Sequence, residues 1–290
     1  MLAAIWLTIK GDLVAADKCI DDLLGLIDAV DVWFGGFNVV HYASGEKCMM
    51  MNSLLKQNRP MLLGNGSDIG DVIGCAFPIL FGAPYLTESM ALPASKSNRK
   101  TLSLTVDIAD GSIDELLIDI CEVILPGARP TGFIKQEQIT QNAMGTGDKD
   151  VWLQRNWDLL KLLFHAPTVP HDDAWSCTIN RAGLEIDDFV FGYQGVPWEI
   201  LHGEIMDELG GMAGIENHWH DTNGSKHPED LEEWIRYYAV MDFFHNKDLK
   251  WKAPLSAAST AKLKLNLGQD EAFHYMTACH VPASKVRDTP

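Results

Sequence analysis

Histidine and acidic residues in the last third of the chain are the candidates for metal chemistry. Alternate residues of a strand share one face, so His218 and His220 could bind one metal ion together. The side chains that could contribute are His202, Glu204, Glu216, His218, His220 and Asp221. No third ligand follows at the spacing of a metalloenzyme motif. The alternatives are a cupin-like metal site and a solvated polar loop. The spacing favours the loop, so we predict no metal ligand and no cofactor.

A second group of side chains could supply a nucleophile and its base. Its members are His165, His171, Asp172, Asp173, Ser176 and Cys177. No G-x-S-x-G turn is present, and closeness in sequence is not closeness in space. The Gly-rich stretch 64–70 weakly resembles a phosphate loop but lacks a following Lys-Ser or Lys-Thr, so we expect a surface loop. No catalytic residue is predicted, and the chain is not expected to be an enzyme.

The elements that would position such residues follow a pattern that occurs twice. A Pro-containing loop, a strand with leucine at alternate positions and a strand ending in proline lie within 92–126 and again within 253–282. Leu102 and Leu263, and likewise Leu104 and Leu265, are 161 residues apart. Upstream, Asp22-Leu23-Leu24 resembles Asp158-Leu159-Leu160. Because the landmarks recur in one order, they predict two copies of one domain.

Short strands dominate both predicted copies. Alternating or β-branched apolar runs predict strands at about 3–10, 28–34, 37–42, 101–108, 115–125, 132–139, 150–154, 160–168, 175–181, 187–193, 235–244, 261–267 and 272–281. One helix is expected from Ser44 to Leu55 and another from Pro197 to Gly210. Residues 57–98 read as long loops with a short strand at 74–80, and 211–231 as a polar insertion.

These elements predict an all-β protein made of two tandem antiparallel jelly-roll sandwiches, each with a short helix. The strands do not alternate with regular helices, which argues against a Rossmann or TIM-barrel design. The stiff segment 126–130 contains two prolines and a glycine, so we place the domains at 1–128 and 129–290.

Composition excludes several other classes of protein. The net charge of −17 disfavours a phosphate-binding surface, and we expect no direct sequence-specific nucleic-acid binding. No apolar run reaches the length of a membrane span, and the N-terminal residues do not resemble a signal peptide. The cysteines form no CxxC pair and are expected to be reduced and buried, Cys121 and Cys279 in the core. Nine tryptophans suit sandwich cores or subunit contacts.

The whole chain resembles the double jelly-roll major capsid proteins of tailless icosahedral viruses. The segments that carry the resemblance are 7–11, 22–24, 35–36, 151–155, 158–160, 179–183 and 189–191, together with the closing loop and strands of both copies. The first copy departs from the family's pattern because it is short at its N-terminal edge, where a strand or arm would be missing.

The resemblance implies a viral structural protein, as in bacteriophages, that forms homotrimers. These trimers act as pseudo-hexameric capsomers and tile an icosahedral shell, often over an internal lipid membrane. Neighbouring capsomers and minor capsid or penton proteins would be its partners. The chain would then be found in the virion after assembly in the host cytoplasm. Two alternatives stay open from the residues: a bicupin-like metal-dependent enzyme, and a carbohydrate-binding spike or lectin module.

Overall fold

The computed structural model describes residues 1–15, 20–65, 69–93, 100–107, 113–170, 175–209 and 235–285. The chain divides into two compact units. Unit 1 comprises Met1–Ile134, Glu208–Trp234 and Pro282–Pro290, and unit 2 comprises Lys135–Asp207 and Ile235–Val281. The domain boundary between residues 128 and 129 stays a prediction, because compact units need not coincide with duplicated copies.

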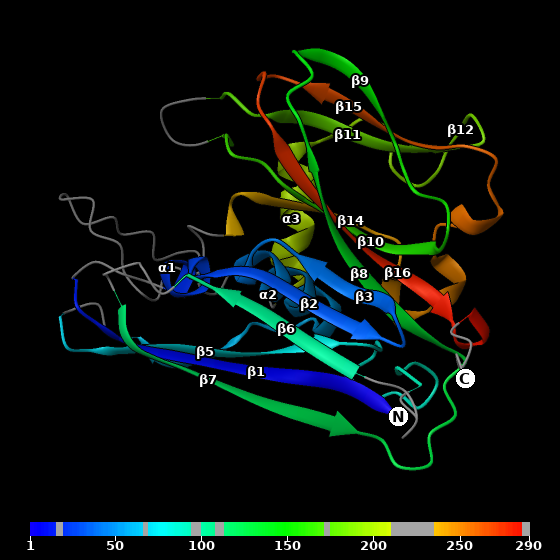
Figure 1. Cartoon of the computed structure of the whole chain (residues 1–290). Helices are drawn as coiled ribbons and strands as arrows, with labels where there is room; N and C mark the ends of the chain where they lie inside the picture. Colours follow the sequence, from blue (N-terminus) through cyan, green and yellow to red (C-terminus); the bar gives the residue numbers. More distant parts are fainter. Residues whose placement is uncertain are drawn as a thin grey trace. The chain divides into compact units, whose positions relative to one another are not determined.

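Unit 1 contains two antiparallel rows of strands, in the orders β4-β5-β1-β7 and β3-β2-β6. Figure 1 shows β1 between β5 and β7, and β2 between β3 and β6. The elements are β1 (Leu2–Leu13), α1 (Ile20–Gly25), β2 (Ile27–Phe34), β3 (Phe37–Tyr42), α2 (Gly45–Lys56), β4 (Met61–Asn65), β5 (Val72–Leu80), β6 (Lys100–Val106) and β7 (Ile113–Ile124). In β1 every second residue, including Leu7 and Ile9, is fully buried, as expected for a strand that covers a core.

Helix α2 is buried along almost its whole length, and one polar side chain fixes it to a strand. The Asn52 amide donates to the Cys48 carbonyl at 2.8 Å, and its oxygen accepts from the Leu80 backbone N–H at 2.7 Å. This bond ties α2 to the end of β5 and satisfies polar groups that burial would otherwise penalise. The helix ends at Gln57, which adopts a left-handed conformation with φ of 58°.

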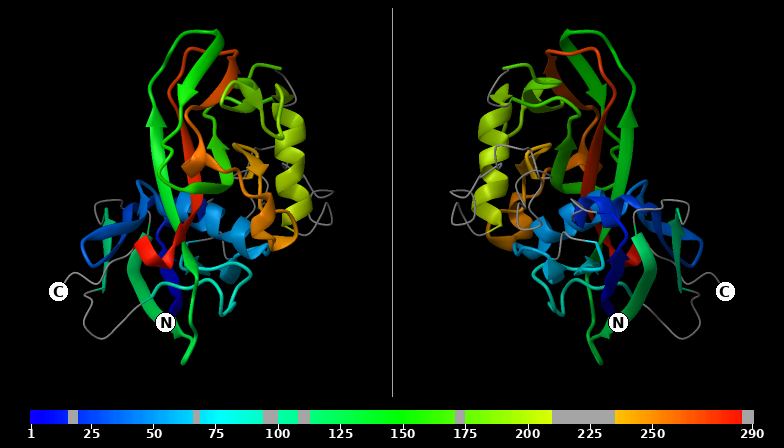
Figure 2. Two further views of the ribbon diagram at one scale, coloured as in Figure 1. Left: turned by 90° about the vertical axis from the view of Figure 1, so that its right-hand side faces the viewer. Right: turned by 90° about the vertical axis from the view of Figure 1, so that its left-hand side faces the viewer.

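Unit 2 also contains two antiparallel rows of strands, in the orders β14-β10-β16-β8 and β12-β11-β15-β9. Its elements, some of which extend by a few residues into unit 1, are β8 (Gly132–Gln141), β9 (Gly147–Trp152), β10 (Asp158–His165), β11 (Ile179–Ile186), β12 (Phe189–Val190), β13 (Val196–Pro197), α3 (Trp198–Glu208), β14 (Tyr238–Asp242), η2 (His245–Lys247), η3 (Leu249–Trp251), η4 (Leu255–Ala257), β15 (Ala261–Leu267) and β16 (Phe273–Pro282). The short helix η5 (Ala283–Lys285) follows β16 and belongs to unit 1. Figure 2 shows β8 and α3 on opposite sides of this unit.

Strand order relates the two units. The row β5-β1-β7 of unit 1 matches β14-β10-β16 of unit 2, and β3-β2-β6 matches β12-β11-β15. Along the chain, a helix lies between corresponding strands in both units: α2 lies between β3 and β5, and α3 lies between β12 and β14. Among the described residues, no strand of unit 1 corresponds to β8 or β9. The prediction of an all-β chain with two sandwiches and short helices is confirmed.

One landmark of the predicted duplication is wrong. Residues Asp22, Leu23 and Leu24 lie in helix α1, whereas Asp158 begins strand β10. The counterpart of β10 in sheet order is β1. A short run of leucines after an aspartate fits either element, so it carries no information about which one forms.

Other predicted boundaries also needed correction. The strand expected at 175–181 begins only at Ile179, and the one expected at 187–193 shrinks to Phe189–Val190. Strand β4 forms within the stretch expected to be loop, because Met61 and Leu62 pair with Ala76 and Cys75 of β5. The polar insertion at 211–231 lies outside the described residues.

Candidate functional site

Only part of the predicted metal cluster lies in the described ranges. His202 and Glu204 are in α3, and Glu216, His218, His220 and Asp221 lie outside. His202 Nδ1 is 2.8 Å from the Tyr238 carbonyl oxygen, and the Glu204 carboxylate accepts a hydrogen bond from the Tyr193 hydroxyl at 2.8 Å. Within the described ranges, no group of three or more His, Cys, Asp or Glu side chains could hold a metal ion.

Glu204 belongs to a buried polar cluster behind α3, formed with Lys161, Tyr193 and Asp242. Lys161 Nζ and the Asp242 carboxylate are 3.0 Å apart, and both side chains are almost fully buried. The Asp242 carboxylate also accepts from the Phe244 backbone N–H at 2.7 Å. Burial raises the pKa of Glu204, and the negative charge of Asp242 adds to this, while the Tyr193 hydrogen bond opposes it. Within the cluster the charges of Lys161 and Asp242 neutralise each other, and its residues link β10, β14 and α3.

The predicted nucleophile group is not assembled as a reactive site in the described residues. The Cys177 thiol is buried and lies 3.1 Å from the Ile179 carbonyl oxygen. Burial raises its pKa to about 12, so the reactive thiolate is scarce near neutral pH. The His165 ring packs instead against Tyr238, with centroids 4.8 Å apart. The partners His171, Asp172 and Asp173 lie outside the described residues.

The predicted glycine loop is also only partly described. Gly64 and Asn65 end strand β4, residues 66–68 lie outside the described ranges, and Gly70 forms a turn with φ of 90° before β5. Because β4 and β5 are antiparallel neighbours, the stretch connects two strands rather than a strand and a helix. A phosphate loop needs a helix N-terminus next to it, so this context does not provide one.

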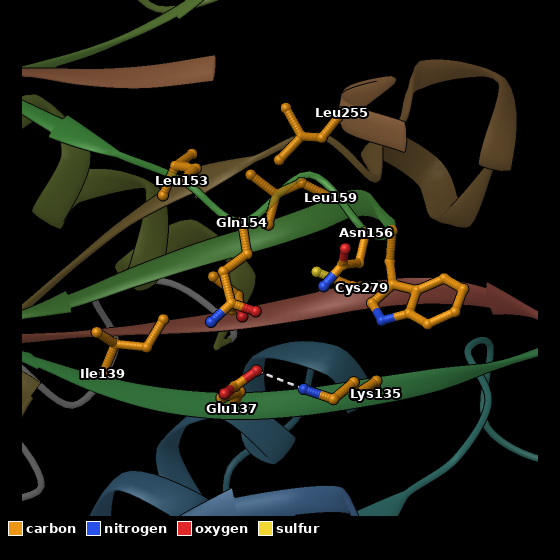
Figure 3. Close-up of a pocket in the computed structure, with 11 residues that line it drawn as sticks. Lys135, Glu137, Ile139, Leu153, Gln154, Asn156, Leu159, Leu255 and Cys279 are labelled. Carbon is orange, nitrogen blue, oxygen red and sulfur yellow. Dashed lines mark hydrogen bonds and ion pairs between the residues drawn. The ribbon is translucent and has the colours of Figure 1, made fainter. Parts of the chain in front are cut away.

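A small hollow opens in unit 2 between β8 and the segment that joins β9 to β10 (Figure 3). Its floor is apolar and includes Leu153, Leu159 and Leu255. Lys135 and Glu137 form an ion pair at its rim. The remaining lining residues are Ile139, Gln154, Asn156, Trp157, Thr277 and Cys279. Its one lysine and one glutamate neutralise each other, so the hollow suits an uncharged or apolar group, such as a side chain of a neighbouring molecule, rather than an ion.

The outer face of the sheet β12-β11-β15-β9 in unit 2 carries charged side chains from neighbouring strands. Cross-strand neighbours share a face, and one row runs from Val190 through Glu185 and Lys262 to Trp152. Lys262 Nζ is 2.9 Å from the Glu185 carboxylate and lies over the Trp152 ring at 5.3 Å. The Trp152 side chain is 63% exposed. A large aromatic ring among neutralised charges is typical of a protein interface.

Unit 1 presents a comparable outer face on β3-β2-β6. Trp33 is exposed there and pairs with Thr101 of β6. Nearby, Asp31 accepts a hydrogen bond from the Asn38 amide at 3.1 Å and pairs with His41 at 2.8 Å. Both exposed tryptophans fit the predicted subunit contacts, whereas Trp198 is buried in the core of unit 2. None of the helices in the described ranges is long and apolar enough to cross a membrane.

The cysteine predictions are partly wrong. Five cysteines are free thiols, as expected, and Cys19 lies outside the described residues. Cys48, Cys75 and Cys177 are buried, but Cys121 is exposed on β7. Its counterpart in the last strand of unit 2, Cys279, is largely covered, and burial raises its pKa to about 12. Sequence position in the last strand therefore does not guarantee burial, because β7 is an edge strand.

Sequence reasoning missed the hollow and foresaw only part of the outer faces. The lining of the hollow comes from four segments far apart in the chain, so no local pattern marks it. The outer face left a weak signal, because Lys262, Lys264 and Asn266 alternate with the buried Leu263 and Leu265. That alternation indicates which side of β15 faces solvent but not which strands lie beside it.

No protein-family model matches this sequence. No curated protein sequence matches it either.

Solved structures do match. The STIV MCP is 10% identical with a TM-score of 0.64, and the match covers 100% of this chain and 91% of that one. The major capsid protein P2 from bacteriophage PM2 is 11% identical with a TM-score of 0.60, covering 97% and 89%. The PBCV-1 virus capsid is 9% identical with a TM-score of 0.57, covering 97% and 86%. Over nearly its whole length, the chain therefore has the fold of the double jelly-roll major capsid proteins of icosahedral viruses.

Proposed function

We propose that this chain is a structural major capsid protein, not an enzyme, and that it trimerises into pseudo-hexameric capsomers that tile an icosahedral viral shell. The observation that carries the proposal is the pair of jelly-roll units in one chain, with a fold shared over nearly the whole length with capsid proteins of several viruses. Three chains with two similar units each present six similar sandwiches around a three-fold axis, which lets a trimer occupy a six-fold position.

The outer sheet faces are the surfaces that we assign to subunit contacts. Trp152 in unit 2 and Trp33 in unit 1 are exposed aromatic rings on such faces. Aromatic anchors that become buried contribute most of the binding energy at protein interfaces. The salt bridges beside Trp152, between Lys262 and Glu185 and between Lys264 and Asp150, would fix the register of a contact more than its strength.

The partners and location follow from the same proposal. The chain would bind copies of itself, neighbouring capsomers and minor capsid or penton proteins, and the shell would lie over an internal lipid membrane in some virions. The protein would reside in the virion after assembly in the host cytoplasm. The net charge of −17 is consistent with a capsid shell protein that makes no direct sequence-specific contacts with nucleic acid.

Light scattering after size-exclusion chromatography tests the trimer. One chain has a mass of 32.2 kDa, so three chains give 3 × 32.2, about 97 kDa. The variant Trp152→Arg should shift the trimer to monomer, because it places a charge in the proposed contact. Trp251→Arg is the matched control, since Trp251 is also exposed but lies in η3 rather than on a strand of this sheet.

Electron microscopy of the purified protein tests the shell. We expect closed icosahedral particles, alone or after addition of the other virion proteins. A protein that stays monomeric at high concentration, with no particles in infected cells, would contradict the proposal.

A further inference from the structure

Unit 2 contains a buried amine and a buried carboxyl group that lie close enough to react with each other. Lys161 of β10 and Asp242 of β14 are direct cross-strand partners, and Figure 1 shows these two strands side by side. Lys161 Nζ is 3.0 Å from Asp242 Oδ1. We propose that the ion pair of the freshly folded chain is slowly converted into a covalent amide bond between the two side chains. The proposal does not depend on the capsid role.

The surroundings of this pair are apolar. The side chains of Lys161 and Asp242 are 1% and 7% exposed. On the same face of the sheet, the neighbouring Ala278, Leu163 and Val240 are fully buried. Burial disfavours separated charges, so the neutral amine and the neutral acid are populated more often here than in water. The neutral amine is the nucleophile, and the protonated carboxyl group is the form that it can attack.

The two carboxyl oxygens of Asp242 have different neighbours. Oδ1 accepts a hydrogen bond from the Phe244 backbone N–H at 2.7 Å. Oδ2 is 3.8 Å from His245 Nδ1, and the His245 side chain is 59% exposed, so its ring can exchange protons with solvent. The Phe244 N–H would stabilise the negative charge that develops on Oδ1 during attack. His245 would act as the general acid that protonates Oδ2.

The reaction is a condensation that needs no other reactant. The lone pair of Lys161 Nζ attacks Asp242 Cγ, and a C–N bond forms. The bond from Cγ to Oδ2 breaks, and this oxygen leaves as water. The water carries the carboxyl proton and a second proton donated by His245, which is replenished through solvent by the proton that the amine releases. No atom is oxidised or reduced.

Fixed geometry is what makes this condensation possible. Reacting groups held in an attack geometry behave as if present at roughly 10⁵–10⁸ M, provided that the reacting atoms are about 3–3.5 Å apart. The distance of 3.0 Å between Lys161 Nζ and Asp242 Oδ1 places the amine beside the carboxyl group. The amide also removes two charges whose burial is costly. Because it joins β10 to β14, the bond would close a covalent loop around residues 162–241 and restrict the unfolded chain.

A second lysine–aspartate pair in unit 2 provides a comparison within the same chain. Lys252 Nζ is 2.8 Å from Asp158 Oδ2, and the two side chains are 28% and 14% exposed. Burial alone would raise the pKa of Asp158, but hydrogen bonds from Lys252 and Ser256 outweigh it and lower the pKa. This carboxyl group therefore stays ionised, and an ionised carboxylate resists attack by an amine. We expect no amide bond there, although its atoms are closer.

Intact-mass spectrometry of the full chain tests the proposal. The chain is refolded from denaturant, kept at neutral pH, sampled over several days and denatured again before each measurement. We expect a species lighter by one water molecule to accumulate with time. Tandem mass spectrometry of a tryptic digest should then find a branched peptide that joins Lys161 to Asp242, and none that joins Lys252 to Asp158.

Two variants and one condition serve as controls. His245→Gln removes the proton donor at an exposed position and should slow the mass loss by about 100-fold. Lys161→Arg keeps a cation beside Asp242, but its guanidinium does not form this amide, so the full mass should persist. Wild-type chain kept in denaturant should also retain its full mass, and this control requires no variant to fold.

Three results would overturn the proposal. One is a folded wild-type chain that keeps its full mass throughout. Another is an equal loss of water in the folded and the denatured samples. The third is a loss of water that maps to a cyclic imide at an aspartate instead of to the branched peptide. Equal rates in wild type and His245→Gln would overturn the role that we assign to His245.

Discussion

Strands β6 and β15 carry nearly the same pattern and have different surroundings. Both have leucine at two alternate positions, Leu102 and Leu104 in one and Leu263 and Leu265 in the other. The leucines of β15 are almost fully buried, whereas those of β6 are half-buried. The difference lies in their neighbours, because β15 has β11 and β9 on its two sides and β6 has only β2 among the described strands. Alternation therefore decides which face points inward, and neighbouring strands decide how much of that face is covered.

Disruption of a charged pair is expected to give the largest difference between the two units in the loss of unfolding free energy. In unit 2, Lys161→Met leaves the buried Asp242 without its cation, and should lower the free energy of unfolding by about 3–5 kcal/mol. In unit 1, Lys100→Met disrupts an exposed pair with Glu122 and should cost about 0–1 kcal/mol. Urea denaturation measures both.

The double variant Lys161→Met with Asp242→Asn is the control for this prediction. It removes the unpaired charge while keeping an oxygen that can accept from the Phe244 N–H, so it should recover much of the lost stability. Equal losses for the variants at Lys161 and Lys100 would contradict the contrast between the two pairs.

Truncation of equivalent leucines should produce the next largest difference. Leu265→Ala opens a cavity in a covered core and should cost about 2–5 kcal/mol. Leu104→Ala removes a side chain that is already partly in water and should cost roughly 1–2 kcal/mol. Hydrogen exchange within each strand assigns the loss to its own unit. If Leu104→Ala proved as costly as Leu265→Ala, β6 would be covered in solution.

Acid should weaken unit 2 through Asp158, at the start of β10. Burial alone would raise the pKa of Asp158, but hydrogen bonds from Lys252 and Ser256 outweigh it and lower the pKa. A lowered carboxyl pKa stabilises the fold above the unfolded value of about 3.9, and this contribution is lost as the pH falls through the folded value. Lys252→Met should therefore lower the urea midpoint at pH 7, and the difference from wild type should shrink below about pH 4. A difference that persists unchanged at low pH would assign the loss to packing of the lysine stem instead.

The last comparison concerns the reactivity of two thiols and requires no substitution. Cys121 of β7 is exposed, whereas Cys279 of β16 is largely covered and burial raises its pKa to about 12. Since the thiolate is the reactive form, iodoacetamide at pH 8 should modify Cys121 roughly 100-fold faster or more. Peptide mass spectrometry gives both rates in one sample, with the buried Cys75 as an internal control. Similar rates at Cys121 and Cys279 would show that β7 is covered.

Most strands could be predicted from the sequence because their patterns are local. Alternation marked β6 to within two residues and β15 at both ends, and the proline and acidic residue at 197–199 marked the start of α3. Strand β4 was missed because its short run has little pattern of its own and forms by pairing with β5. The run Asp22-Leu23-Leu24 was misread as the counterpart of a strand, since leucines fit helix α1 equally well.

The candidate surfaces were less accessible to sequence reasoning. Exposed tryptophans could be suspected as contacts, but nothing local separates Trp152, which is exposed, from Trp198, which is buried. The hollow beside Lys135 and Glu137 needs segments that meet only in the folded chain. The burial of Lys161 beside Asp242 was likewise invisible, because the two residues are far apart in the sequence and meet across paired strands.

By itself, the sequence determined that this chain forms two successive β-sandwiches with short helices. The reason is that apolar and polar side chains alternate along a strand, and this alternation can be recognised within a few residues. Only the tertiary structure decided that β15 and β16 of unit 2 have neighbouring strands on both sides, whereas β6 and β7 of unit 1 are edge strands among the described residues. Coverage depends on which distant strands pair, and pairing is settled by the whole set of contacts rather than by any one segment.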